Sequence, residues 1–316
     1  RFCDPSNDKE AWSKEAEKYW MPVDLYVGGV EHAVLHLLYS RFWHKVLYDC
    51  GFVTTLEPFK TLRNPGIITS RSYQRDSGGY VDPLQVVEKQ GEFFDKVTGE
   101  RLQSQVEKMS KSKLNGVNPD DIIEEYGADS LRLYEMFMGP LEKEKIWNSD
   151  AVSGCRRFLN RFYDMATSEK VTEPDDSEGI KLASKLIYGV TQDLESLQFN
   201  TAIAKMMEFI NDFTKLPVYC KKAVMMATHA LSPFAPHMAE EVWEILGCKE
   251  SLIDKPYPEI DPKVFEEAVT TYVVQVNGKV RGRFELPKDQ EQGAILEAAK
   301  LHPIIAKYLD GQKIEK

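Results

Sequence analysis

The chain has 316 residues, of which 42% are hydrophobic and 28% are charged, and its formal net charge is −10. This length predicts two or three domains, and the composition is typical of a soluble globular protein without a membrane-spanning segment. The acidic balance argues against broad, nonspecific nucleic-acid binding, although it leaves room for a local basic surface. Residues 268–316 hold eight lysines and arginines against six acidic residues, whereas the rest of the chain holds 32 against 44. We therefore expect a polyanion to bind this tail most readily.

The cysteines are five, an odd number, and no two of them have the CxxC spacing of a zinc site. They indicate reduced, buried thiols in a cytoplasmic protein rather than a disulfide framework. The N-terminal stretch "RFCDPSNDKEAW" lacks the apolar core of a secretion signal, which also favours the cytoplasm. No metal site is predicted. The five cysteines are Cys3, Cys50, Cys155, Cys220 and Cys248.

The first third of the chain has the pattern of an α/β domain. "VDLYVGG" (residues 23–29) predicts a short buried strand, and residues 30–51 predict a long amphipathic helix that ends at Gly51. A strand, a glycine turn and a helix form half of a βαβ unit, so we expect a partial Rossmann-type parallel sheet. Another short strand is expected after Pro65–Gly66. The turn-rich residues 74–105 predict a small β insertion.

The remainder changes from mixed to helical structure and then to α+β structure. Residues 118–140 predict two short helices, and residues 149–246 show apolar spacings of three and four that predict a bundle of four helices. After a Pro-rich connector, "TYVVQVNGKVRGRFELP" predicts a hairpin around Asn277–Gly278, and residues 290–302 predict a helix. The predicted fold is therefore multidomain: a partial α/β domain, an all-α bundle and a small α+β C-terminal domain.

A lysine-rich loop, "KMSKS", occupies Lys108–Ser112 and is followed by Lys113 and a turn at Asn115–Gly116. Ammonium groups on flexible stems, among small hydroxyl side chains, suit a polyphosphate whose charge moves during a reaction. A lysine run of this kind can also be a solvated loop without a ligand. The residues of the loop that would touch a nucleotide are Lys108, Met109, Ser110, Lys111 and Ser112.

A second motif lies at the predicted strand-to-helix turn. Gly28 and Gly29 would let the backbone approach a nucleotide closely, and Glu31 could accept hydrogen bonds from ribose hydroxyls. His32 and His36 are four residues apart and therefore share one helix face. From the residues alone, this pair could bind a metal or could be two histidines with ordinary hydrogen-bond partners.

Both motifs resemble the class I aminoacyl-tRNA synthetases, and the Gly-Gly-x-Glu-His turn resembles the leucyl-tRNA synthetase family. The resemblance implies that Lys108 and Lys111 are catalytic and that Lys111 stabilises the α-phosphate transition state and the leaving pyrophosphate. It further implies that Gly28, Gly29, Glu31 and His32 hold adenosine, and that His32 and His36 line the leucine pocket. The implied reaction converts leucine and ATP, with Mg²⁺ in the substrate complex, to leucyl-adenylate and then transfers leucine to tRNA(Leu). No tightly bound metal or prosthetic group is implied.

Other segments resemble the tRNA-binding parts of that family. Residues 116–149 resemble the helical linker that braces the acceptor stem, in which Asp129 and Arg132 would be capping or salt-bridge residues. His237 would pack at a helix start. Several cations could contact tRNA, although those on the first bundle helix could equally form internal ion pairs. These cations are Arg156, Arg157 and Arg161 on that helix, and Lys279, Arg281 and Arg283, which alternate along one predicted strand.

The resemblance implies four regions: 1–115, the second half of the catalytic domain; 116–149, the linker; 150–255, an anticodon-binding-type bundle; and 268–316, a truncated C-terminal domain. The family's first nucleotide-binding motif and its editing domain have no counterpart here. We therefore expect a fragment of a monomeric enzyme, bound to no membrane and inactive alone in aminoacylation and pyrophosphate exchange. The alternatives are a fragment of an isoleucyl-, valyl- or methionyl-tRNA synthetase, or a free-standing tRNA-binding module.

Overall fold

The computed structural model describes residues 2–261, 269–276, 279–287 and 292–301. The chain divides into two units, Arg1–Glu259 and Ile260–Lys316. The first unit contains α/β, β and helical parts, and the second contains a strand pair and a helix, so the predicted fold class is confirmed. Within the described ranges, no helix has the length and apolarity needed to cross a membrane.

The N-terminal part contains the predicted βα element and a second parallel strand. After α1 (Lys14–Trp20), β1 (Val23–Val27) pairs in parallel with β2 (Phe59–Arg63), from Val23 opposite Phe59 to Val27 opposite Arg63. The parallel sheet is confirmed, but β2 was not recognised in the sequence. The segment that links the strands contains α2 (Leu38–Asp49).

The prediction that β1 is buried is wrong. Leu25 and Val27 are 43% and 53% exposed. A parallel strand is buried when helices cover both faces of its sheet, whereas the apolar side of α2 is itself open, with Leu38, Tyr39 and Phe42 each about 60% exposed.

The predicted helix over residues 30–51 is present but changes its winding along its length. It begins as a 3₁₀ turn, η1 (Val30–His32), continues as a π-helical turn, η2 (Ala33–Leu37), and becomes regular in α2. Gly51 has φ +78° and follows the last helical residues, a conformation that glycine adopts without strain. The predicted end of the helix is therefore confirmed.

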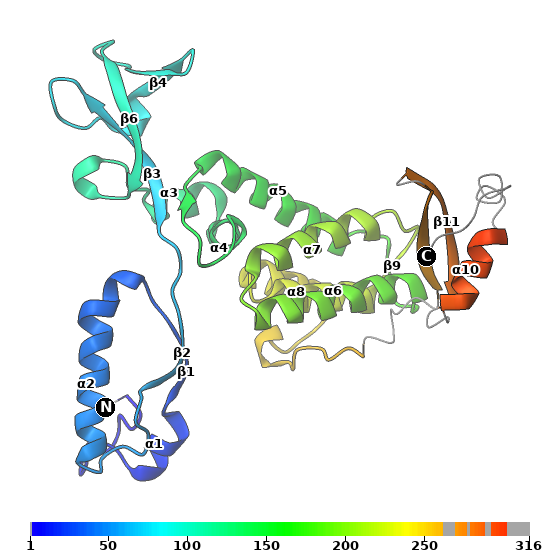
Figure 1. The fold of residues 1–316 in the computed structure, drawn as a ribbon, viewed down its shortest axis with the longest axis horizontal. Helices are drawn as coiled ribbons and strands as arrows, with labels where there is room; N and C mark the ends of the chain where they lie inside the picture. The colour runs from blue at the N-terminus through cyan, green and yellow to red at the C-terminus, as the bar shows by residue number, and fades with distance from the viewer. Residues whose placement is uncertain (1, 262–268, 277–278, 288–291, 302–316) are drawn as a thin grey trace. The chain divides into compact units, whose positions relative to one another are not determined.

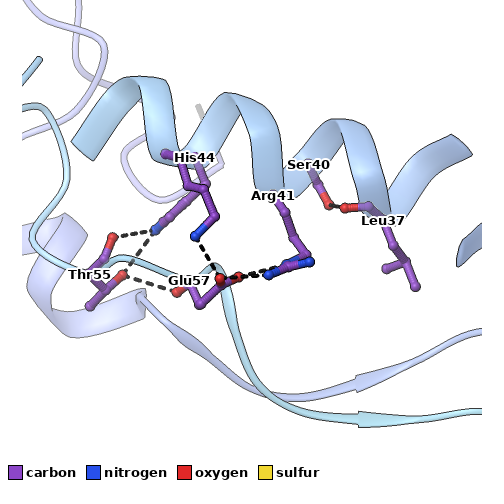
Figure 2. Close-up of polar contacts among 7 residues, drawn as sticks. Leu37, Ser40, Arg41, His44, Thr55 and Glu57 are labelled. Atoms are coloured by element: carbon purple, nitrogen blue, oxygen red, sulfur yellow. Dashed lines mark hydrogen bonds and ion pairs between the residues drawn. The ribbon is translucent and has the colours of Figure 1, made fainter. Parts of the chain in front are cut away.

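A polar cluster attaches α2 to the segment before β2 (Figure 2). Arg41 donates from Nε and Nη2 to the two carboxylate oxygens of Glu57, both at 2.8 Å, and Lys45 Nζ lies 2.7 Å from Glu57 Oε1. The buried His44 shares its Nε2 with the carbonyl and hydroxyl oxygens of Thr55, at 2.8 and 3.1 Å. These contacts fix the chain at the point where it enters β2.

The cluster predicts a pH dependence of stability. Hydrogen bonds from Arg41 and Lys45 lower the pKa of Glu57 from 4.5 to about 2. A carboxyl group whose pKa is lower in the folded state stabilises the fold above its unfolded pKa, and this contribution is lost as the pH falls from about 4.5 toward 2. Glu57→Gln should therefore lower the melting temperature at pH 7, and the difference from wild type should narrow below pH 4.5. Thermal melts followed by circular dichroism at several pH values measure this; a difference that stays constant down to pH 3 would contradict it.

The predicted β insertion is a mixed sheet with strand order β4-β5-β6-β3-β7. In Figure 1, β3 and β6 form its long antiparallel pair, with Thr69 opposite Lys108 at one end. The two-residue strand β7 adds to β3 in parallel. Because β6 ends at Lys108, the insertion delivers the chain directly into the lysine-rich loop. The bounds are β3 (Ile68–Arg75), β4 (Val86–Lys89), β5 (Glu92–Asp95), β6 (Arg101–Lys108) and β7 (Lys145–Ile146), with the 3₁₀ turn η3 (Pro83–Gln85) before β4.

Two short helices follow the loop, as predicted: α3 (Pro119–Tyr126) and α4 (Ala128–Phe137). The buried carboxylate of Asp129 accepts hydrogen bonds from the Met238 backbone N–H and pairs with His237 Nδ1, each at 2.8 Å. Arg132 donates to the carbonyl oxygens of Pro233 and Phe234 at 3.0 and 3.2 Å. The capping role predicted for Asp129 is confirmed, at the start of α9. His237 lies at this helix start as predicted, but the prediction that it packs there is wrong, because its side chain is 76% exposed. Together these contacts join α4 to the helical bundle.

The bundle has five helices among the described residues where four were predicted. Its last predicted helix is divided at Ser232–Ala235 because Pro236, which cannot donate a backbone hydrogen bond, begins a new helix. In the bundle, α6 packs against both α7 and α8 (Figure 1), and buried side chains such as Phe162, Ile203 and Phe213 form its core. The helices are α5 (Ser149–Ala166), α6 (Ser177–Glu195), α7 (Phe199–Phe213), α8 (Lys221–Leu231) and α9 (Pro236–Ile245), accompanied by β8 (Val171–Thr172), β9 (Tyr219–Cys220) and the 3₁₀ turn η5 (Leu252–Asp254).

The second unit contains the predicted strand pair and helix. Strands β10 (Val269–Val276) and β11 (Lys279–Pro287) are antiparallel, and α10 covers Gln292–Leu301. The turn predicted at Asn277–Gly278 lies outside the described residues. The register shifts between Val274 and Gln275, which interrupts the regular pairing expected for β11.

All five cysteines are free, in agreement with the predicted absence of disulfides. Cys155 and Cys220 are buried as predicted, and burial raises the pKa of the Cys155 thiol to about 11. The prediction of burial is wrong for Cys50, which is exposed because it lies at the open end of α2 beside Gly51.

Candidate functional site

The lysine-rich loop is a short, tightly turned segment between β6 and α3. Ser110 is extended, Lys111–Lys113 form the 3₁₀ turn η4, and Leu114 reverses the chain in the left-handed region with φ +54°. The Ser110 and Ser112 hydroxyl oxygens lie 2.9 Å apart. The predicted turn after the lysines is therefore present, one residue earlier than Asn115–Gly116.

The sequence indicated Asn115 only as part of a turn, yet its side chain holds this loop. Its Oδ1 accepts a hydrogen bond from the Ser110 N–H at 2.9 Å, and its Nδ2 donates to Ser70 O at 3.3 Å and to Lys108 O at 3.5 Å. Only 1% of Asn115 is exposed. An asparagine in a polar loop normally suggests a turn residue, so burial was the missing signal.

The three lysines of the loop have different electrostatic surroundings. Lys113 is paired with Glu107, which also accepts from Ser72, and the Lys113 hydrogen bond lowers the pKa of that carboxyl group. Lys108 Nζ lies 3.9 Å from Glu31 Oε1, and both side chains are about half exposed. Lys111 is exposed, and no side-chain hydrogen bond or ion pair to it is found among the described residues. The loop therefore keeps the charge of Lys111 available.

The Gly-Gly turn is held at the end of β1 by the end of β2. The Gly28 N–H donates to Arg63 O at 3.2 Å, and Asn64 Nδ2 donates to Gly28 O at 2.6 Å. The Glu31 carboxylate folds back over Gly29, so a Cβ at Gly29 would lie 2.2 Å from Oε2. A flexible carboxylate can swing away, so Gly29 leaves room for a ligand once Glu31 moves. The ion pair between Glu31 and Lys108 brings this turn and the lysine loop together.

His32 and His36 lie on the same exposed side of the turn, with their rings 6.4 Å apart and edge to face. The ring nitrogen Nε2 of His36 forms a hydrogen bond with the hydroxyl of Tyr26 in β1. Among the described residues, no three His, Cys, Asp or Glu side chains gather as metal ligands would. The roles predicted for His32 in adenosine and leucine binding, and for His36 in leucine binding, stay predictions.

A cavity of about 530 Å³ adjoins the Gly-Gly turn. Its lining includes Val30 from the turn, Asn64 after β2, and the acidic residues Glu142 and Glu144 from the segment before β7. Gly66 also lines this cavity, and this position requires glycine because a Cβ there would lie 2.0 Å from Lys143 O. The loop's own lysines do not line this cavity.

The α5 arginines are exposed and lie along the helix. Arg156 donates to Tyr126 O at 3.3 Å, Arg157 to Ser153 Oγ at 3.0 Å and Arg161 to Asn211 Oδ1 at 2.8 Å. No ion pair to any of the three is found in the part of the chain that the structure describes, so the alternative of internal ion pairs is not supported there. For Lys279, Arg281 and Arg283 the structure describes the backbone of β11 but not the side chains, so their predicted shared face stays a prediction.

The α/β sheet, the lysine loop and the helical bundle define the class of the protein as the class I tRNA synthetases. The model of the family "tRNA synthetases class I (I, L, M and V)" matches residues 94–147, and that of the "Anticodon-binding domain of tRNA ligase" matches residues 176–298. Curated relatives include the leucine--tRNA ligase of Protochlamydia amoebophila, 65% identical over all 316 residues, and that of Chlamydia abortus, 51% identical over the same length. The chain belongs to the leucine--tRNA ligase family, and it spans 37% and 38% of the length of these two relatives.

Solved structures agree with the family. LeuRS of Agrobacterium radiobacter K84, in a ternary complex with tRNA and LeuAMS, matches 96% of this chain with a TM-score of 0.73 and 27% identity, and 38% of that chain is covered. A methionyl-tRNA synthetase of Mycobacterium tuberculosis matches 83% of this chain and 53% of its own with a TM-score of 0.51. At 16% identity, that likeness supports the fold alone.

Proposed function

We propose that this chain is the part of a leucine--tRNA ligase that supplies the mobile cation for ATP and a surface for tRNA(Leu). The observation that carries the proposal is the arrangement of the three loop lysines. Glu107 pairs with Lys113, Lys108 lies near Glu31 at the Gly-Gly turn, and no hydrogen bond or ion pair of the Lys111 side chain is found among the described residues. An unpaired ammonium group on an anchored loop suits a phosphate that gains charge as pyrophosphate leaves.

In this proposal adenosine binds at the turn of Gly28 and Gly29. The carboxylate of Glu31 then leaves its ion pair with Lys108 and accepts hydrogen bonds from the ribose hydroxyls. Met109, Ser110 and Ser112 then adjoin the phosphates, and His32 and His36 border the leucine. Mg²⁺ accompanies ATP as part of the substrate. The reaction depends on positioning and on charge stabilisation, without a covalent intermediate with the enzyme.

The proposal also assigns the regions of the chain. Residues 1–115 belong to the catalytic domain, 116–149 to the linker, 150–255 to the anticodon-binding-type bundle and 268–316 to the C-terminal domain. The contacts from Asp129 and Arg132 to the α8–α9 segment support a linker that is firmly joined to the bundle. We also propose that the whole enzyme is cytoplasmic and monomeric.

The activity can be tested with a chimera in which this chain replaces the matching 316 residues of the Protochlamydia amoebophila relative. We expect the chimera to catalyse leucine-dependent exchange of pyrophosphate into ATP, whereas the isolated chain should not, because it lacks the rest of the catalytic domain. Exchange that depends on isoleucine, valine or methionine instead of leucine would refute the leucine assignment. Exchange by the isolated chain would refute its predicted inactivity alone.

The tRNA surface predicts a specific salt dependence. Each arginine that contacts a phosphate should contribute about one to the slope of log Kd against log salt concentration. Arg157→Ala and Arg161→Ala should each reduce this slope by about one in a titration with a leucine tRNA transcript. Arg41→Ala is the matched control, because Glu57 already pairs with Arg41. Lys279→Ala and Arg281→Ala test the β11 strand in the same way.

Unchanged slopes in both α5 variants would remove this helix from the proposed surface. The same reduction in the Arg41 control would indicate that the slope reports the net charge of the chain rather than contacts with phosphates.

A further inference from the structure

Asn115, which follows the lysine-rich loop, has a polar side chain to which the proposed chemistry assigns no role. Only 1% of Asn115 is exposed, and its side chain lies between β3 and the backbone of the loop. Burying an amide is unfavourable unless its hydrogen bonds are formed. Both polar atoms of the Asn115 side chain form hydrogen bonds, and these bonds offset the unfavourable burial of the amide.

These bonds connect three points of the backbone. The acceptor Oδ1 holds the N–H of Ser110, and the donor Nδ2 holds the carbonyl of Ser70 in β3 and that of Lys108 at the end of β6. Because Thr69 pairs with Lys108 at one end of the β3–β6 register, this anchor lies at that end of the sheet. The start and the end of the loop are thereby fixed to the same platform.

The anchor acts next to Lys111 without occupying its ammonium group. Ser110 immediately precedes Lys111, and its carbonyl accepts the Lys113 N–H at 3.1 Å, so holding Ser110 also holds the first residue of η4. The ion pair between Lys113 and Glu107 fixes the other end of this turn. The backbone of Lys111 is therefore held from both sides, while its side chain stays exposed.

We propose that Asn115 is the positioning residue of the lysine loop. Its buried amide fixes the backbone of Ser110 and thereby the point from which Lys111 reaches toward phosphate. An anchored backbone loses less conformational freedom when the ligand binds, so part of the cost of ordering the loop is met before ATP arrives. This inference rests on the proposed function for the role of Lys111, whereas the anchor itself is a property of the loop.

Two readouts, made on the chimera described above, test the proposal. Hydrogen exchange measures the protection of the Ser110 amide. Pyridoxal 5′-phosphate, which forms an imine with lysine amines and is then fixed by borohydride, measures by peptide mass spectrometry how much Mg²⁺–ATP protects Lys111. We expect Asn115→Ala to speed exchange at Ser110 by about threefold to tenfold, as one lost hydrogen bond implies. The ATP concentration for half-protection of Lys111 should rise by a similar factor.

Asn118→Ala is the matched control, because Asn118 is an exposed asparagine in the same segment that caps α3 through Asp120. It should leave both readouts unchanged. Asn115→Asp keeps the acceptor for Ser110 but loses both donated bonds, and it serves if the alanine variant does not fold. All variants are compared well below their melting temperatures.

Unchanged exchange at Ser110 in Asn115→Ala, the variant that removes the acceptor for the Ser110 N–H, would overturn the anchor. Equal effects of Asn118→Ala on both readouts would show that Asn115→Ala acts by general destabilisation. Faster exchange without a change in the half-protection of Lys111 would overturn the positioning role. If Mg²⁺–ATP does not protect Lys111 in the chimera that carries the unsubstituted chain, the proposed ATP contact of this chain fails, whereas the exchange data still decide the anchor.

Discussion

Replacing Lys111 with alanine is expected to lower leucine-dependent pyrophosphate exchange by about 100- to 1,000-fold in the chimera, the range for losing one preorganised charge at a transition state. The reason is that Lys113 is paired with Glu107, whereas no hydrogen bond or ion pair of the Lys111 side chain is found among the described residues. The effect should fall mainly on kcat, because charge increases on the phosphate as the reaction proceeds and the interaction strengthens in the transition state.

Lys113→Ala is the matched control for this experiment. It removes the same charge from the same loop, but from a side chain that Glu107 already neutralises. We expect a loss of less than about tenfold, because it disturbs only one support of η4. Equal losses in the two variants would mean that the loop acts through its total charge, and the distinct role of Lys111 would be wrong.

Replacing Gly66 with alanine is expected to destabilise the fold by about 1–3 kcal/mol, the typical cost of forcing extra atoms into a packed site. A Cβ at Gly66 would lie 2.0 Å from Lys143 O and 2.7 Å from Glu144 N. Both are backbone atoms, so neither can rotate away as a side chain does. The Gly66 N–H also donates to Leu141 O at 2.8 Å, and separating the two segments would break this bond.

This effect can be measured as a shift in urea or thermal unfolding relative to wild type. Gly116→Ala is the matched control, because a Cβ at Gly116 meets nothing within 4 Å and its backbone needs no positive φ. The control should stay within about 0.5 kcal/mol of wild type, as for most surface substitutions. An equally small change at Gly66 would show that the 140–144 segment shifts freely and is not fixed against β3.

The Gly66 contact matters for function because it connects the two halves of the candidate site. Gly66 lies between β2, which ends beside the Gly-Gly turn, and β3, which pairs with the strand that leads into the lysine loop. A shift of this joint would change the distance between Glu31 and Lys108. We therefore expect Gly66→Ala to lower leucine-dependent pyrophosphate exchange by the chimera even at temperatures where the chimera remains folded, because the two halves of the site would be displaced from each other.

The sequence by itself determined the class of fold and the two motifs of the site. Strand and helix periodicities, together with the glycines at 28, 29 and 51, led to the parallel βα element, the β insertion and the hairpin strands. The pentapeptide at Lys108–Ser112 and the Gly-Gly-x-Glu-His turn indicated the synthetase family. These signals are local, because a turn, a helix end or a short motif depends on residues that are close along the chain.

Only the tertiary structure decided what depends on contacts between distant residues. It exposed β1, divided the last predicted helix of the bundle, and turned Asp129 and Arg132 toward the α8–α9 segment more than 100 residues away. It also distinguished three lysines that look equivalent in the sequence, since Glu107, Glu31 and solvent surround them differently. Burial of Asn115 against Ser70 belongs to the same class. Charge pairing and burial depend on which residues come into contact in the folded chain, and the local patterns of a single sequence do not specify those contacts.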